Sequence, residues 1–130
     1  MKPLLFDTCF LIDLGREMWR RPGPAHAFLE RHALARACIS WIVAGEFAEG
    51  FEDPDEPACR EMLAQFHVLP VDWRTACYYA SIARDLRQRG ELIGANDLWI
   101  ASGALAHGAT LVTRNLGHFK RVPGLETLAH

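Results

Sequence analysis

The sequence has no CxxC pair, and none of its four cysteines has a histidine at the spacing of a zinc finger. This pattern argues against a structural zinc site. Cys9, Cys38 and Cys77 lie in apolar stretches. We therefore expect these three to be small core residues of a protein kept in a reducing compartment.

A long hydrophobic run and a secretory signal are also missing. The longest apolar stretch is interrupted too early to span a bilayer, and no signal peptide precedes the first predicted strand. We expect a cytoplasmic protein that makes no membrane contact.

The sequence has no excess of positive charge, because its formal net charge is -2. No global field then attracts the chain to nucleic acid, so any such contact has to be local. Two groups of arginines stand out, and their pattern is typical of solvated helix faces rather than of RNA tracks: Arg16, Arg20 and Arg21, and Arg84, Arg87 and Arg89.

What is present is a chain of 130 residues, half of them hydrophobic, which suits a single domain over residues 1–130. Short apolar runs predict strands at 3–6, 37–39, 67–71 and 109–112, with an edge strand at 125–128. Helical spacing predicts helices that start near 10–14 and run over 25–34, 41–47, 55–63, 73–89 and 96–107, with Ser40 as an N-cap. Because strands and helices alternate, we expect an α/β fold with a mainly parallel sheet of four or five strands and helices on both faces.

Three carboxylates are the most informative polar residues, since Asp7, Glu46 and Asp97 each lie in an almost wholly apolar stretch without Lys or Arg. A buried carboxylate is costly unless it is paired, protonated or bound to a cation. The economical inference is that the fold gathers all three around a metal ion. Asn115, which follows the apolar run at 109–112, completes a set of oxygen ligands suited to a hard divalent cation.

Each carboxylate also has a structural explanation. Asp7 is placed to form a turn after a strand, and Asp97 is placed to cap a helix. Glu46 has no such role in the middle of a helix. Open parallel sheets bind ligands at the carboxyl ends of their strands, where Asp7 and Asn115 are expected.

The residues together resemble a PIN domain, and specifically the VapC ribonuclease toxins of type II toxin-antitoxin systems. The resemblance covers nearly the whole chain and rests on four segments in order: Leu4 to Asp13, Ala44 to Gly50, Asn96 to Ala101, and Leu111 to Asn115 followed by His118 and Phe119. Each motif alone is weak, and their order and spacing make the match specific.

The resemblance implies an endoribonuclease that depends on Mg²⁺, for which Mn²⁺ substitutes, with Asp7, Glu46, Asp97 and Asn115 as catalytic and metal-binding residues. It further implies that Thr8 and Thr113 orient the ligands or the attacking water. RNA is the implied substrate, a VapB-like antitoxin the implied inhibitor, and a homodimer the implied assembly. Cys9 stands where the family often has a polar residue.

Three other classes of protein are alternatives to a ribonuclease. A catalytically inactive PIN-like module that binds RNA or protein is the main alternative, and the intact acidic set argues against it. A haloacid-dehalogenase-type phosphatase needs a second Asp where this chain has Cys9, and a response-regulator receiver needs a well-placed Lys after a late strand. Both classes are therefore disfavoured.

For the metal-free site, we expect mutual repulsion and burial to raise the pKa values of the three carboxylates.

Overall fold

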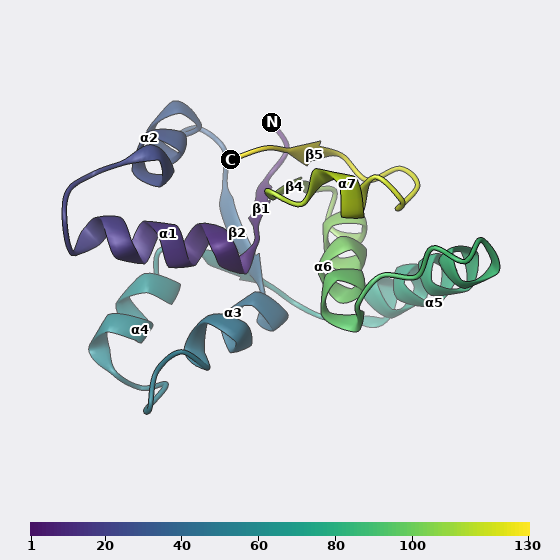
Figure 1. The fold of residues 1–130 in the computed structure, drawn as a ribbon, viewed down its shortest axis with the longest axis horizontal. Coiled ribbons are helices and arrows are strands. Elements are labelled where there is room, and N and C mark those ends of the chain that lie inside the picture. The colour runs from purple at the N-terminus through teal and green to yellow at the C-terminus, as the bar shows by residue number, and fades with distance from the viewer.

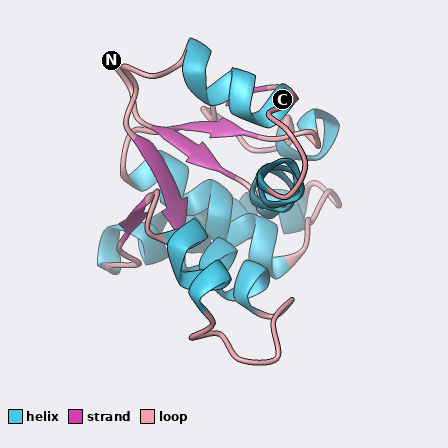
Figure 2. Cartoon of the chain, turned by 90° about the vertical axis from the view of Figure 1, so that its left-hand side faces the viewer, coloured by secondary structure: helices cyan, strands magenta, loops and turns pink.

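The computed structural model describes residues 1–130 and contains one sheet of five parallel strands in the order β3-β2-β1-β4-β5. The strands are short: β1 is Leu4–Phe6, β2 Ala37–Ser40, β3 His67–Leu69, β4 Thr110–Val112 and β5 Thr127–Leu128. Figure 2 shows them fanned out with the twist usual for a parallel sheet. The predicted parallel α/β sheet is confirmed.

Seven helices connect and cover the strands: α1 is Thr8–Met18, α2 Pro24–Arg31, α3 Trp41–Ala48, α4 Pro57–Leu63, α5 Trp73–Gln88, α6 Ala95–Ala106 and α7 Leu116–Phe119. In Figure 1, α1, α2 and α4 lie on one side of the sheet, and α5 and α6 lie on the other. Helix α3 contacts both α1 and α6. None of the helices is long and apolar enough to cross a membrane.

Local chemistry accounts for several helix ends. Ser40 is the N-cap of α3 as predicted, and its hydroxyl accepts a hydrogen bond from the N–H of Val43 at 3.1 Å. Gly90 and Gly108, which follow α5 and α6, have φ angles of 67° and 61°. That left-handed conformation favours glycine at the end of a helix.

The core is a single cluster that includes Leu5, Phe6, Phe10 and Leu111, all fully buried. Leu5 lies in the central strand, in register with Cys38 of β2 and Leu111 of β4. The aromatic rings of Phe6 and Phe10, tilted against each other with centroids 4.3 Å apart, join the sheet to α1.

The prediction for the cysteines is right for Cys38, which is buried, and wrong for Cys9 and Cys77, which are exposed. The reason lies in helix geometry. Phe10, Leu11 and Leu14 form the buried side of α1, and Cys9 does not share that side.

The strand order places a reversal point between β1 and β4. The chain moves from β1 outward through β2 to β3, and then returns through α5 and α6 to β4 on the other side of β1. In open parallel sheets, ligands bind at the carboxyl ends of the strands that flank such a reversal. Asp7 directly follows β1, and Thr113 and Asn115 follow β4.

Candidate active site

Asp7 is held between β1 and α1. It is the N-cap of α1, where its Oδ1 accepts a hydrogen bond from the N–H of Phe10 at 3.0 Å. The Nε2 atom of His130 lies 3.1 Å from the same oxygen, and the Asp7 side chain is only 15% exposed. Burial by itself raises the pKa of Asp7, but hydrogen bonds from His130, Phe10 and Thr113 and the charge of His130 outweigh it. The pKa of Asp7 is therefore lowered, so the expectation of a raised value is wrong for this residue.

Glu46 lies on α3, and both of its carboxylate oxygens are engaged. The Thr8 hydroxyl donates to Oε1 at 2.7 Å, and the Asn96 amide donates to Oε2 at 3.3 Å. These donors come from α1 and α6, and they stand next to Asp7 and Asp97 in the chain. Glu46 is therefore fixed between the other two carboxylates.

Asp97 lies in the first turn of α6, whose N-cap position is Gly94 without a side-chain capping bond. The structural alternative of Asp97 as a helix cap is therefore wrong. Burial raises the pKa of Asp97, and the negative charges of Glu46 and Asp7 raise it further against the opposing effect of His118. The direction of this shift agrees with the expected rise in pKa. It also shows that Glu46 and Asp7 lie close enough to Asp97 for their charges to act on it.

Asn115 and Thr113 follow β4 at the same edge of the sheet. The backbone N–H of Asn115 donates to the Thr113 hydroxyl at 3.0 Å, and that hydroxyl also bonds Asp7. Thr113 is almost completely buried. Thr8 and Thr113 thus contact Glu46 and Asp7 respectively, and their role in orienting ligands or water stays a prediction.

Two histidines complete the contacts, and sequence reasoning did not assign either to the site. The Nδ1 atom of His118 lies 3.1 Å from Oδ2 of Asp97 and 2.9 Å from the amide nitrogen of Asn115. One ring nitrogen cannot both donate to Asp97 and accept from Asn115, so these contacts are alternatives that belong to different tautomers. His118 belongs to one of the segments that resemble the family, so that resemblance could have indicated it. His130 lies 123 positions from Asp7 in the sequence, and no local pattern indicates their contact.

The structure brings the predicted residues into one connected network. Asp7 contacts Thr113, which contacts Asn115, and Nδ1 of His118 lies within reach of either Asn115 or Asp97. No Lys or Arg forms an ion pair with Asp7, Glu46 or Asp97. As the side chains stand, no three His, Cys, Asp or Glu groups are close enough to hold a metal ion.

Comparison with protein-family models identifies the family, because residues 4–125 match the PIN domain. This chain belongs to the PIN-domain family. Among the relatives of this PIN domain, Ribonuclease VapC2 of Haemophilus influenzae is 32% identical over 132 aligned residues, covering 98% of this chain and 97% of the relative. Ribonuclease VapC2 of Rickettsia felis is 43% identical over 92 aligned residues, covering 67% of this chain and 69% of the relative.

A solved structure of VapBC2 from Rickettsia felis, bound to a DNA fragment from its promoter, has the same fold as this PIN domain. The TM-score is 0.84 at 28% sequence identity, and the match covers 98% of both chains. The fold class predicted from the sequence is therefore shown by a structure as well as by sequence relatives.

The residues of this PIN domain fit a hard divalent cation in donor type and in charge. Asp7, Glu46, Asp97 and Asn115 offer oxygen atoms, the kind of ligand that Mg²⁺ prefers. The raised pKa of Asp97 shows negative charge that no Lys or Arg neutralises. In the metal-free arrangement the carboxylate oxygens bond to His118, His130, Thr8 and Asn96 instead.

Proposed function

We propose that this PIN domain is a metal-dependent endoribonuclease of the VapC type. The observation that carries the proposal is the convergence of Asp7, Glu46 and Asp97 at the carboxyl edge of the sheet without a Lys or Arg partner. The names of the relatives, Ribonuclease VapC2 in both organisms, support the same reaction. RNA is then the substrate, and a phosphodiester bond is the bond hydrolysed.

Mg²⁺ is the cofactor that we propose, with Mn²⁺ as a substitute. Asp7 and Asp97 would bind it directly, Glu46 directly or through water, and Asn115 through its side-chain oxygen. When bound, such an ion polarises a phosphoryl oxygen and makes a bound water more acidic. His130 contacts only Oδ1 of Asp7 and His118 only Oδ2 of Asp97, so each aspartate keeps a second oxygen for the ion.

Glu46 and Asp97 have different surroundings, which suggest different roles in the hydrolysis. Glu46 is held at both oxygens by Thr8 and Asn96, so it is suited to orienting the attacking water. Asp97 lies beside Glu46 and Asp7, close enough for their charges to raise its pKa in the metal-free site, so it is suited to sharing the cation with them. In the hydrolysis, the water oxygen bonds to phosphorus and loses a proton to solvent, while the bond from phosphorus to the leaving oxygen breaks and that oxygen keeps the electron pair and takes a proton from solvent.

Control by an antitoxin is the second part of the proposal, and it is motivated by the VapBC complex among the structural neighbours. An apolar groove of about 480 Å³ between α1, α3 and α4 offers a place for such a partner, lined by Gly15, Met18, Trp19, Phe47, Phe51, Pro57, Ala58, Glu61 and Met62. Trp19 is 84% exposed there, which is unusual for a large apolar side chain. A basic side chain of the antitoxin inserted among the carboxylates would block the site.

The homodimer stays a prediction, because the contacts within a single chain do not test it. Size-exclusion chromatography with light scattering measures it directly. A monomer at micromolar concentration would contradict it.

Metal dependence is tested with purified, partner-free protein and a labelled RNA. We expect cleavage in Mg²⁺ or Mn²⁺, no cleavage in EDTA, and recovery when excess Mn²⁺ is added back. Unchanged cleavage in excess chelator would refute the metal-dependent reaction. Binding of RNA without any cleavage in either metal would favour the alternative of an inactive PIN-like binding module.

A further inference from the structure

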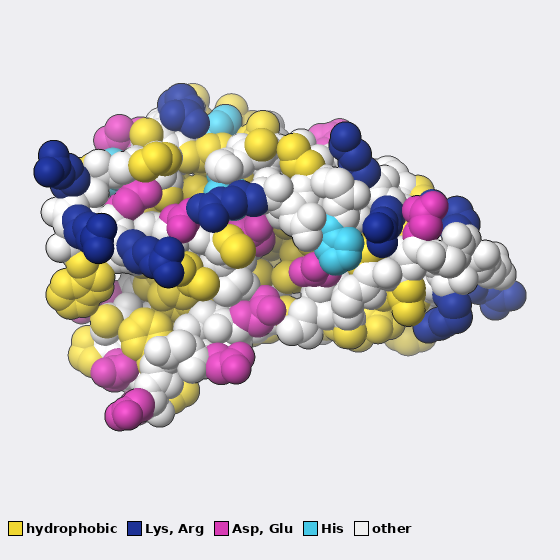
Figure 3. Space-filling model, viewed as in Figure 1, with side chains coloured by type: hydrophobic (Ala, Val, Ile, Leu, Met, Phe, Trp, Pro, Cys, Tyr) yellow, Lys and Arg dark blue, Asp and Glu magenta, His cyan; other side chains and the backbone are white.

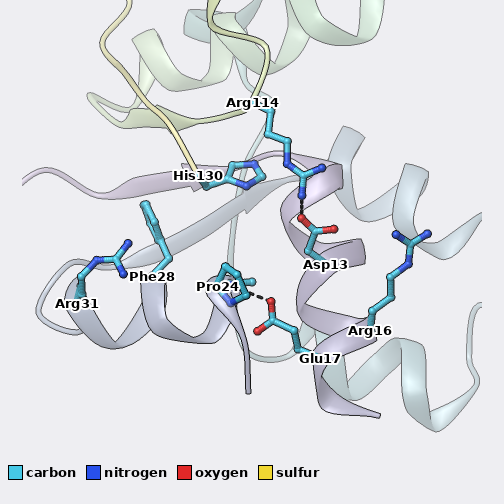
Figure 4. A pocket seen from close by; sticks show the side chains of 9 residues that line it. Asp13, Arg16, Glu17, Pro24, Phe28, Arg31, Arg114 and His130 are labelled. Atoms are coloured by element: carbon cyan, nitrogen blue, oxygen red, sulfur yellow. Dashed lines mark hydrogen bonds and ion pairs between the residues drawn. The ribbon is translucent and has the colours of Figure 1, made fainter. Parts of the chain in front are cut away.

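A pocket of about 460 Å³ lies between α1 and α2. It is lined by Asp13, Arg16, Glu17, Pro24, Ala25, Phe28, Arg31, Arg114 and His130. Figure 4 shows Arg16 and Arg31 at opposite sides of this pocket, with Arg114 and His130 along its upper edge. The pocket adjoins the candidate active site, because His130 also contacts Asp7 and Arg114 directly precedes Asn115.

The two acidic residues of the pocket are already engaged. Asp13 forms an ion pair with Arg114. Glu17 accepts hydrogen bonds from the backbone N–H groups of Gly23, Ala25 and His26, at 2.7, 2.8 and 3.0 Å. Those groups belong to the N-terminal end of α2, whose dipole favours a negative charge. Glu17 therefore stabilises the N-terminal end of α2 and forms no ion pair with the arginines of the pocket.

The arginines Arg16 and Arg31 have no ion-pair partner. The guanidinium of Arg31 lies over the ring of Phe28, 5.7 Å from its centroid, which leaves its N–H donors free for another group. A second pocket of about 590 Å³ shares Arg16 and Glu17 with the first and extends to Arg20 and Arg21. Figure 3 shows Lys and Arg side chains gathered over α1 and α2.

We propose that this arginine groove, formed by the unpaired Arg16, Arg20, Arg21 and Arg31, binds the phosphates of the RNA strand beside the bond that is cleaved. The inference rests on the proposed ribonuclease function and goes beyond the sequence-based prediction that Arg16, Arg20 and Arg21 form a solvated face. A guanidinium binds phosphate through two parallel hydrogen bonds, and a row of them follows a phosphate backbone.

The surroundings favour a phosphate chain over other anions. The groove meets the candidate active site at His130, which lines the pocket and contacts Asp7, so a strand bound near Asp7 has the arginines beside it. In a chain of net charge -2, a local excess of unpaired arginines is the contact that such a strand requires. Phe28 is buried in the core, so its ring is not exposed in the groove for reading bases. Contacts to phosphates alone carry no information on the RNA sequence.

The test measures RNA binding without cleavage. A short fluorescein-labelled single-stranded RNA is titrated with full-length protein in EDTA, by fluorescence anisotropy, over a series of NaCl concentrations. For the double variant Arg16→Gln and Arg31→Gln, we expect affinity to fall roughly tenfold or more. The slope of log affinity against log salt concentration should decrease by about 0.7 for each phosphate that the variant no longer neutralises.

The matched control is Arg84→Gln with Arg87→Gln, which removes the same charge from the exposed side of α5. We expect this control to bind RNA like the unmodified protein, and Arg16→Lys with Arg31→Lys to recover most of the salt dependence. Equal losses in the two Gln double variants would overturn the proposal. Unchanged RNA binding together with weaker antitoxin binding would also overturn it, and would assign the groove to an acidic peptide.

A cleavage assay with Mn²⁺ on the same samples separates the two proposals. Cleavage by the unmodified protein without a specific binding loss in the Arg16 and Arg31 variant refutes the groove alone. A specific binding loss in a protein that never cleaves RNA refutes the ribonuclease function and leaves a phosphate-binding groove.

Discussion

At the scale of single residues, Asp7 and Asp97 have pKa values displaced in opposite directions although they share one site. Burial raises both, but Asp7 receives hydrogen bonds from His130, from the Phe10 backbone and from Thr113, and these lower its pKa overall. Asp97 is affected by burial and by the charges of Glu46 and Asp7, which His118 only partly offsets. Hydrogen-bond donors, rather than burial alone, decide which carboxylate holds a proton more readily.

Asp97→Asn should raise the melting temperature of the metal-free protein near neutral pH. Because the folded state holds a proton on Asp97 that the unfolded chain releases, stability falls as pH rises from 3.8 through the raised pKa. The variant lacks that loss, so the two melting temperatures should converge below pH 3.8. Thermal melts in EDTA across this pH range measure the difference. If Asp97→Asn melts lower in EDTA and keeps the full stabilisation by Mn²⁺, Asp97 has a purely structural role.

Asp7→Asn should have the opposite sign. Its lowered pKa means that the charged form is stabilised by folding, and this contribution is present above pH 3.8 and lost as pH falls through the lowered pKa. We expect the variant to melt below the unmodified protein at neutral pH, with a difference that shrinks in acid. The same melts in EDTA check it, and a rise in melting temperature would contradict the assignment of His130 as the partner of Asp7.

Thr8→Val should impair the reaction far more than the fold. The change removes the hydroxyl that donates to Glu46 at 2.7 Å and keeps the shape of the side chain. Loss of such a supporting hydrogen bond lowers activity by roughly 10- to 100-fold, whereas it costs about 1 kcal/mol of stability. RNA cleavage rates and urea unfolding measure the two effects. Thr8→Ser, which keeps the hydroxyl, is the control, and equal rates for Val and Ser would remove Thr8 from the site.

At the scale of elements, local chemistry in the sequence predicted most of the scaffold. Ser40 before an apolar helix and apolar runs bounded by turns were sufficient for the strands and the long helices. Helix α7 was not predicted, because one turn over residues 116–119 has no periodicity. The contact of His130 with Asp7 was missed for a different reason, since strand β5 brings distant residues together and no local pattern reports it.

Ser40→Ala should destabilise the protein by about 1 kcal/mol through loss of the cap on α3. Because Ser40 is buried and its hydroxyl accepts the Val43 N–H, water cannot easily replace the bond. Urea unfolding measures the change, with Ser81→Ala on the exposed side of α5 as the control. Equal unfolding midpoints for the two variants would show that the cap contributes nothing.

The groove between α1, α3 and α4 predicts where an antitoxin binds. Trp19→Ser should weaken the complex by roughly tenfold or more, because large aromatic side chains dominate the energetics of interfaces. Leu34→Ser is a matched control, since Leu34 is 89% exposed and does not line the groove. Calorimetric titration with the antitoxin measures both variants. A larger loss for Leu34→Ser would place the antitoxin elsewhere.

At the scale of the whole molecule, the strand order creates the site and the surface charge surrounds it. The order in which the parallel strands are added reverses between β1 and β4, which brings Asp7 and Asn115 to one edge, and α3 and α6 add Glu46 and Asp97. The arginine groove then adjoins the acidic site at His130, which lines the groove and contacts Asp7. A near-neutral chain thus has local fields of both signs, which its net charge of -2 does not reveal.

The most direct measurement is the rate at which partner-free protein cleaves a labelled RNA in Mn²⁺, compared between the unmodified chain and Asp97→Asn prepared in parallel. We predict that the variant loses more than the roughly 10- to 100-fold expected for an outer hydrogen bond, while its melting temperature in EDTA is not lower. Equal cleavage by the two proteins would contradict the assignment of the carboxylate cluster as the catalytic site.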